Sequence, residues 1–382
     1  MKEDYKKYAD EVVQLRHYFH QHPELSNQEI ETTEKIKEIL TGWGIKIIPT
    51  ELETGLVAEI KGESKGATIA LRADIDALPV EERTDLAFKS ESEGIMHACG
   101  HDLHITSLLG AIRYFNGHKN LIKGTVRFLF QPAEETGSGA NQVLAKDVLH
   151  GVQAILGFHN NPNFKTNEIA LQKGPMMAGC YKFEIKISGR GSHGAKPEKG
   201  SDPIVTLGEM ISSLQTIVSR NINPQDAVVV SVTRVSAGSV WNIIPGEAVL
   251  GGTVRLFKLE NAELVKQRLT KIAENIAAAH DQEVSVDWEE RTLPIANDAA
   301  LTNAVIDNLD FKVVQPILSM AGEDFATYQK QVPGVFAFVG SNGAPDAADW
   351  HDPKFIGLDE TLPTGIGYFV EGALGILNYL NT

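Results

Sequence analysis

The sequence predicts an α/β protein of two domains, in which a mixed, mainly parallel sheet is interrupted by a small inserted α+β domain. Short apolar strands alternate with helices as far as about residue 178, which is typical of a parallel sheet with helices on both faces. Between 179 and 291 the strands instead alternate apolar and polar residues, as strands with one solvent-exposed face do. The first pattern returns near Leu293, so we expect one domain at 1–178 and 292–382 and another at 179–291.

Length and composition agree with a globular protein of this kind. At about 150 residues per domain, 382 residues correspond to two or three domains. A hydrophobic content of 42%, with 34 glycines and 16 prolines, excludes a disordered chain, collagen and a coiled coil. The net charge of −15 argues against a nucleic acid or an anionic membrane as partner, because phosphate groups are bound by basic surfaces.

Cysteine use and the lack of long apolar runs favour a cytoplasmic enzyme. Cys99 and Cys180, the two cysteines of the chain, are too few for a disulfide framework. The first seven residues are charged and lack the apolar run of a signal peptide. No stretch approaches the roughly 18 uncharged apolar residues of a membrane-spanning helix, so we expect no membrane partner.

The first predicted domain consists of helices and buried strands in alternation. Apolar residues recur at helical intervals before Pro23, before Gly42 and after Asp102, which is placed to cap the third helix. The predicted helices are 5–18, 27–40 and 103–115, and the predicted strands are 68–72, 125–130 and 154–158. A further buried strand is expected at 335–339, in the last part of the chain.

The inserted domain has the element order of a small ferredoxin-like sheet. Asp202 is placed to cap a helix whose first residue is Pro203, a position that proline favours. The predicted order is strand 181–187, helix 203–219, strands 227–235 and 248–256, helix 260–279 and strand 283–288. This βαββαβ order predicts an antiparallel sheet with both helices on one face.

Polar clusters follow the buried strands of the first domain directly. These clusters are Arg72 to Asp76, Gln131 to Glu135, and His159, and a fourth cluster, His97 to Asp102, leads into a helix. Trp350-His351-Asp352 lies in the last segment. Because ligands of open α/β sheets bind beyond the carboxyl ends of the strands, these clusters predict one common site.

The residue types of these clusters indicate a metal site that hydrolyses amides. A thiolate, imidazoles and carboxylates together suit zinc and related divalent metals rather than calcium or magnesium. Cys99 and His101, two positions apart on a loop, can turn toward one centre. Of the adjacent Glu134 and Glu135, one can bind metal while the other takes a proton from a metal-activated water and delivers it to a leaving amine.

These residues resemble the aminoacylase and carboxypeptidase-type metallopeptidases. The similar branch is that of the amidohydrolases, which includes auxin-conjugate hydrolases, hippurate hydrolases and bacterial N-acetyl-amino-acid deacetylases. The resemblance runs nearly end to end, through blocks in family order: 20–25, 71–79, 96–102, 131–135, 157–159, 191–194, 242–245, 252–255, 322–325 and 350–351.

The resemblance implies a function for each of several residues. The implied ligands of a two-ion site, with zinc, manganese, nickel or cobalt, are Cys99, His101, Glu135, His159 and His351. Glu134 is then the general base, and the inserted domain is a lid that also forms a homodimer. His193 on this lid resembles the residue that stabilises the oxyanion, in some members from the partner subunit. Asn242 and Arg255, also on the lid, resemble contacts to the substrate carboxylate or acyl oxygen.

One departure concerns residue 72. The wider family has a metal-binding histidine where Arg72 stands, and a guanidinium offers no lone pair to a metal, so Cys99 is expected to compensate. Asp74 and Asp102 are expected either to orient a ligating imidazole or to be ordinary turn and cap residues.

The predicted activity is the metal-dependent hydrolysis of N-acyl amino acids, with acetyl as the expected acyl group. Two alternatives on the same residues are an N-acetyl-diaminopimelate deacetylase and a dipeptidase, and a third is a catalytically silent protein that binds acylated amino acids. Gly189-Arg-Gly-Ser-His-Gly194 matches a dinucleotide motif, but the next helix begins too late, at Pro203, to bind a pyrophosphate. A dehydrogenase is therefore disfavoured.

Overall fold

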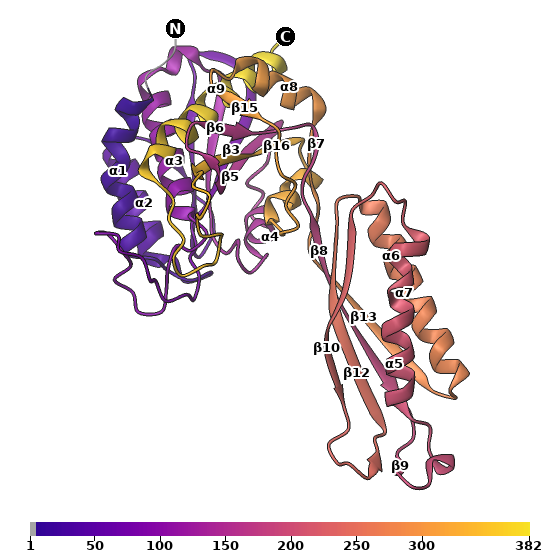
Figure 1. The fold of residues 1–382 in the computed structure, drawn as a ribbon. Coiled ribbons are helices and arrows are strands. Elements are labelled where there is room, and N and C mark those ends of the chain that lie inside the picture. The colour runs from indigo at the N-terminus through magenta and orange to yellow at the C-terminus, as the bar shows by residue number, and fades with distance from the viewer. Residues whose placement is uncertain (1–4) are drawn as a thin grey trace. The chain divides into compact units, whose positions relative to one another are not determined.

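The computed structural model describes residues 5–382, which form two compact units (Figure 1). The first unit comprises the chain up to Met176 together with Ala296–Ile317 and Asp324–Thr382. The second comprises Met177–Ile295 and Leu318–Glu323. Among the described helices, none is long and apolar enough to cross a membrane.

The first unit is built on a mixed sheet of eight strands. In spatial order these are β1 (Lys46–Ile48), β2 (Leu56–Lys61), β4 (Lys123–Gln131), β3 (Ser64–Asp74), β5 (Ala154–Lys165), β16 (Gly334–Asn342), β6 (Glu168–Ala170) and β15 (Lys312–Val314). The central strands β4, β3, β5 and β16 pair in parallel, whereas β1, β2 and β4 pair antiparallel, as do β16 and β6. The predicted strands are the central ones, and the sequence analysis missed the short strands toward both edges.

Helices cover this sheet, and their apolar faces are buried against its strands and against one another. Helices α1 (Lys6–Gln21), α3 (His101–Gly117) and α9 (Leu362–Leu380) pack on one another, and α3 and α9 also pack on β3 and β5. They share one hydrophobic core with α2 (Ile30–Gly42) and α8 (Ala299–Asn308) (Figure 1). The short α4 (Gly139–Leu144) packs against β4 and the 3-10 helix η3 (Asp324–Lys330).

The expected N-cap of α3 is wrong. The helix begins two residues earlier than predicted, at His101, after Gly100 with φ 79°. Asp102 therefore lies in the first helical turn, where a carboxylate favours the positive end of the helix dipole. Its side chain accepts hydrogen bonds from buried Arg16 and from His20. The carboxylate therefore binds these two side chains instead of the backbone N–H groups that an N-cap residue would bind.

The second unit contains an antiparallel sheet with the order β10 (Val228–Ala237), β12 (Glu247–Leu256), β8 (Gly179–Ser188) and β13 (Glu283–Thr292). Helix α7 (Leu259–Ala279) and the pair α5 (Pro203–Leu214) and α6 (Thr216–Asn221) lie on one face (Figure 1). The predicted helix 203–219 is thus two helices, and Asp202 accepts from the Ile204 N–H at 2.9 Å as its predicted cap. A small second sheet of this unit pairs β9 (Ser192–His193) with β11 (Ile243–Ile244). Another small sheet pairs β7 (Gly174–Met177) with β14 (Ile295–Asn297), and most residues of these two strands belong to the first unit.

Candidate metal centre and active site

The five predicted metal ligands lie together in the first unit. Cys99 Sγ is 3.3 Å from His159 Nε2 and 3.5 Å from His351 Nε2. Glu135 Oε2 is 3.5 Å from His351 Nε2, and its other oxygen, Oε1, is 3.8 Å from His101 Nε2. Atoms that bind one ion at about 2.0 to 2.3 Å are themselves about 3 to 4 Å apart. These side chains therefore have the spacing of metal ligands.

The donor atoms form overlapping groups rather than a single one. Among the described residues, Cys99, His101 and His159 form one group of mutually close donor atoms, and Cys99, Glu135 and His351 form another. Cys99 belongs to both, and His101 and Glu135 share a third group with Glu134. These residues would supply more donors than the about four that one zinc-like ion takes in structural sites, so the set would suit two ions.

Hydrogen bonds at Nδ1 orient the imidazoles of His101 and His159 so that their Nε2 atoms face this centre. His101 Nδ1 lies 2.8 Å from the Asp76 carbonyl oxygen, and His159 Nδ1 lies 2.7 Å from the Asn160 carbonyl oxygen. A carbonyl only accepts, so both Nδ1 atoms carry a proton, and both Nε2 atoms are left to face the centre. Among the residues the structure describes, no hydrogen-bond partner reaches His101 Nε2, although this atom is fully buried. An orphaned buried nitrogen of this kind fits a bound cation.

The electrostatics of the centre also fit cations. Burial lowers the pKa of His101, but Asp74 and Asp76 outweigh it and raise the pKa to about 10. The same negative charges would also favour a metal cation at this nitrogen. Burial and the carboxylates of Glu135 and Glu134 raise the pKa of the Cys99 thiol, so its thiolate needs a compensating positive charge.

Glu134 lies beside these ligands on a turn that the fold holds firmly. Glu134 is almost fully buried, and the backbone N–H of Asp324 donates to its Oε1 at 3.3 Å. Ala133, the preceding residue, has φ 55°, in the left-handed region that side chains rarely adopt. This backbone conformation lets Glu134 and Glu135 both face the donor group of His101.

Asp74 binds the imidazole of His104 rather than that of a predicted ligand. Asp74 Oδ1 is 2.5 Å from His104 Nδ1, while its Oδ2 accepts from Arg72 at 2.6 Å and lies 3.8 Å from His101 Nε2. The Asn160 N–H donates to His104 Nε2 at 2.9 Å, so His104 has no lone pair left for a metal. Asp102 likewise contacts Arg16 and His20 instead of a ligand.

Two residues without a predicted role, Glu29 and Asp76, hold the turn that carries Glu134 and Glu135. Glu29 is buried and accepts from the N–H of Ala133 at 2.8 Å and from Thr54 Oγ1 at 2.8 Å. Asp76, which follows β3, accepts from the N–H of Glu135 at 3.0 Å. Asp76 belongs to the polar cluster that follows β3, whereas Glu29 lies outside every polar cluster and carries no sequence signal.

The three predicted lid residues lie in the second unit, and they are not all close together. His193 is exposed and pairs with Ile243, next to Asn242, whose carbonyl accepts from the Gly194 N–H at 2.8 Å. Arg255 donates to the Met320 carbonyl at 3.3 Å from the other end of β12. Eight residues of strand, about 27 Å, separate Arg255 from the end of β12 that follows β11.

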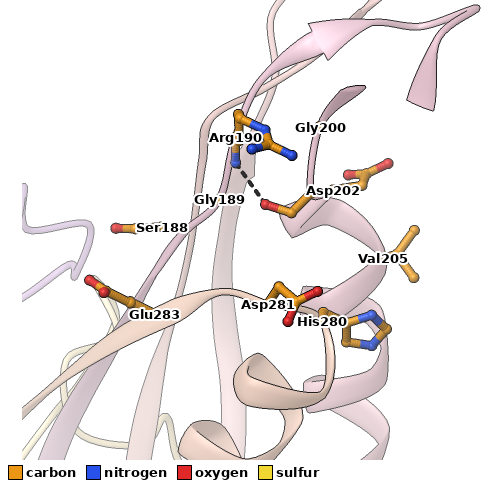
Figure 2. Close-up of a pocket in the computed structure, with 10 residues that line it drawn as sticks. Ser188, Gly189, Arg190, Gly200, Asp202, Val205, His280, Asp281 and Glu283 are labelled. Atoms are coloured by element: carbon orange, nitrogen blue, oxygen red, sulfur yellow. Dashed lines mark hydrogen bonds between the residues drawn. The ribbon is translucent and has the colours of Figure 1, made fainter. Parts of the chain in front are cut away.

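A polar pocket in the second unit is distinct from these residues. It encloses about 610 Å³ and borders both ends of the 190–200 loop that carries His193. Figure 2 shows Arg190, Asp202, His280, Asp281 and Glu283 around it, and the Arg190 N–H donates to Ser201 Oγ at 2.9 Å. The predicted site residues are absent from its lining.

Comparisons with known proteins agree with this geometry. The chain is 45% identical to an N-acetyl-L-cysteine deacetylase of Bacillus subtilis over 96% of its own length and 88% of that protein. It is 36% identical to an N-acetyldiaminopimelate deacetylase of Ligilactobacillus salivarius, over 87% of the chain and 88% of that protein. A Bacillus subtilis structure described as a dinuclear metal-binding peptidase of family M20 superposes with a TM-score of 0.89, at 41% identity, over 98% of this chain and 99% of that one.

The family profile of peptidase family M20/M25/M40 matches residues 70–374, which include all the residues of the metal centre. The resemblance predicted from the sequence motifs is therefore confirmed, and with it the class of enzyme, a hydrolase. This chain belongs to peptidase family M20/M25/M40.

Proposed function

We propose that this protein is a metal-dependent amidohydrolase that cleaves N-acyl amino acids, preferentially N-acetyl ones, into a carboxylate and the free amino acid. The observation that carries the proposal is the convergence of Cys99, His101, Glu135, His159 and His351 beside Glu134. The names of the relatives support the acetyl group, since deacetylases of two different N-acetyl amino acids are among them.

In this proposal the five convergent side chains hold two divalent ions, and zinc, manganese, nickel and cobalt all suit the donor set. When bound, such ions polarise an acyl carbonyl and make a water molecule acidic enough to be a nucleophile near neutral pH. Glu134 is the proposed general base, because its buried carboxylate shares a donor group with two of the ligands. It takes the proton of the attacking water and then protonates the leaving amine.

The second unit is the proposed lid and dimerisation domain, with 179–291 as its boundaries and 1–178 and 292–382 as the catalytic domain. His193 is proposed to donate to the oxyanion, and Asn242 and Arg255 to the acyl oxygen or carboxylate. An N-acetyl amino acid is about 7 Å long, whereas about 27 Å of strand separates Arg255 from the end of β12 that follows β11. A homodimer resolves this distance, with His193 and Asn242 of one copy acting beside Arg255 of the other.

Other parts of the proposal concern location and alternatives. We propose a cytoplasmic enzyme with a small-molecule substrate and no nucleic-acid partner. A specific N-acetyldiaminopimelate deacetylase is the second candidate, favoured by the 36% identity to a protein of that name. A dipeptidase would use the same residues. A catalytically silent binding protein is disfavoured, because it would need no general base, and Glu134 lies beside the candidate ligands.

The proposal is tested by hydrolysis of a substrate panel with protein reconstituted with each metal. The panel contains N-acetylcysteine, other N-acetyl, N-benzoyl and indoleacetyl amino acids, N-acetyldiaminopimelate and dipeptides, and bound metal is counted by elemental analysis. We expect hydrolysis of N-acetyl amino acids that requires about two ions per chain. A metal-loaded Glu134→Gln variant should lose activity by roughly 10²- to 10⁴-fold, and full activity of this variant would refute the assignment of the base.

A further inference from the structure

Arg72 is a buried cation, and each of its three side-chain nitrogens donates a hydrogen bond. Its side chain is fully excluded from solvent. Nη1 donates to Asp74 Oδ2 at 2.6 Å, Nη2 donates to Asp324 Oδ1 at 2.8 Å, and Nε donates to Gln131 Oε1 at 2.8 Å. A guanidinium is suited to this arrangement because it is planar and always charged, and its donors point in fixed directions.

The contacts of Gln131 fix the orientation of its amide. Its Oε1 accepts from Arg72 and also from the hydroxyl of Tyr328 at 2.8 Å. Its Nε2 donates to both carboxylate oxygens of Asp324 at 2.9 Å, and to the carbonyl of Pro132 at 3.2 Å. Gln131 ends β4 and immediately precedes the turn that carries Glu134, so its side chain anchors the start of that turn.

Asp324 connects this anchor with both ends of the turn. Its Oδ2 accepts from the N–H of Ala140, which follows the turn, at 2.9 Å. Its own backbone N–H donates to Glu134 Oε1 at 3.3 Å. The carboxylate of Asp324 thus receives hydrogen bonds from before and after the turn, while its main chain holds the side chain of Glu134 between them.

The turn itself adopts a conformation that needs such support. Ala133 lies in the left-handed region with φ 55°, a conformation that persists only where the surrounding contacts impose it. Gly139 approaches so closely that an added Cβ would lie 1.7 Å from the carbonyl oxygen of Pro132. Small displacements of the turn are therefore resisted on both sides.

We propose that Arg72 is a positioning residue for the reaction, which acts through Gln131 and Asp324 on the carboxylate of Glu134. It does not touch the ions or the substrate; it keeps Asp324 and Gln131 in the geometry that holds Glu134. This inference rests on the proposed role of Glu134 as general base. Arg72 thus does more than remove the metal-binding histidine that the wider family has at this position: it also positions Glu134.

The first test is Arg72→Lys, which keeps the charge but replaces three directed donors by one point charge. We expect kcat to fall by about 10- to 100-fold, as is typical when a group that orients a catalytic residue is changed. KM should change by less than about threefold, and the metal content should stay at the wild-type value, since Arg72 holds no ion. A folded, metal-loaded variant with wild-type kcat overturns the proposal, as does a kcat that falls in proportion to lost metal.

A second variant keeps the test decisive if Arg72→Lys does not fold. Tyr328→Phe removes one neutral hydrogen bond to Gln131 Oε1 and leaves every charge in place. Tyr5→Phe is its matched control, because this buried hydroxyl donates to Glu371 at 3.2 Å within the same unit, away from the turn. We expect kcat to fall by about 3- to 10-fold in Tyr328→Phe and to stay unchanged in Tyr5→Phe. Equal kcat values in the two variants overturn the proposal.

A double-mutant cycle separates this inference from the proposed function. If Arg72 acts through Glu134, then Arg72→Lys should lower the residual kcat of Glu134→Gln by less than about twofold, because the positioned group is already gone. If the two losses multiply, Arg72 acts by another route and the inference is wrong, although Glu134 remains the base. Full activity of Glu134→Gln alone would instead refute the proposed function.

Discussion

His20 offers a quantitative test of how charge is arranged beside the metal centre. Its ring is buried between two carboxylates: Nδ1 lies 3.0 Å from Asp102 Oδ2, and Nε2 lies 3.3 Å from Glu82 Oε1. Carboxylates only accept, so both contacts are favourable at the same time only if both ring nitrogens carry protons. The geometry therefore requires a positively charged imidazole.

The expected magnitude follows from the pKa of this group. Burial lowers the pKa of His20, and Arg16 lowers it further, but Asp102 and Glu82 outweigh both and raise the pKa to about 9 from the ordinary 6.5. At 1.36 kcal/mol per pKa unit, the difference corresponds to about 3 kcal/mol of folding free energy. Because the folded-state pKa is the higher one, this contribution is complete below about pH 6.5 and is lost as the pH rises through 9.

The assay compares the wild-type protein with His20→Gln by urea unfolding between about pH 6 and pH 10. Both proteins are stripped of metal, so that metal binding does not add its own pH dependence. The advantage of the wild-type protein should shrink by about 3 kcal/mol across this interval. A stability difference between the wild-type protein and His20→Gln that stays constant from about pH 6 to pH 10 would refute a charged His20.

Three further predictions concern the centre and the stability of the chain. Cys99→Ser should lower the bound metal measured by elemental analysis, because a hydroxyl is a far weaker ligand than a thiolate, whereas Cys180→Ser should keep it. Gly139→Ala should lower kcat by at least about tenfold in a steady-state assay, because its Cβ would lie 1.7 Å from the carbonyl oxygen of Pro132 and displace the turn. Gly208→Ala, in the middle of α5 with open space around the added methyl, should raise the free energy of unfolding in urea by about 0.5 to 1 kcal/mol.

The central part of the fold was predictable because burial dictates it. Strands β3, β4 and β5 are apolar on both faces, and only a sheet covered on both sides accounts for such runs. Strands β6 and β15, with three residues each, were not predictable, since so short a segment has no measurable period. Their place is set by pairing with β16 and with each other, which is a tertiary effect.

The convergence of the candidate metal ligands was predictable from residue type and, for some of them, from their position after strands. Thiol, imidazole and carboxylate are uncommon together, and Glu135 and His159 stand where polar residues follow apolar runs, whereas Cys99 precedes a helix. His351 has a weaker signal, since a long segment separates it from β16, and its φ of 66° depends on contacts of the folded chain. For this residue the motif resemblance provided what the periodicity did not.

Residues that hold the ligands differ in kind from the ligands, and this explains why sequence reasoning assigned them poorly. Arg72 and Asp324 are 252 positions apart, and neither residue alone differs from an ordinary surface charge. The two residues meet only because β3, β4 and η3 bring both to Gln131, where the fully buried guanidinium pairs with the carboxylates of Asp74 and Asp324. A charged residue directly after a buried strand can therefore have one of two roles. It can bind a metal, or it can be the counter-charge that holds an acidic side chain in place. We propose the second for Arg72, because a guanidinium cannot bind a metal and, where it is buried, needs acids as partners.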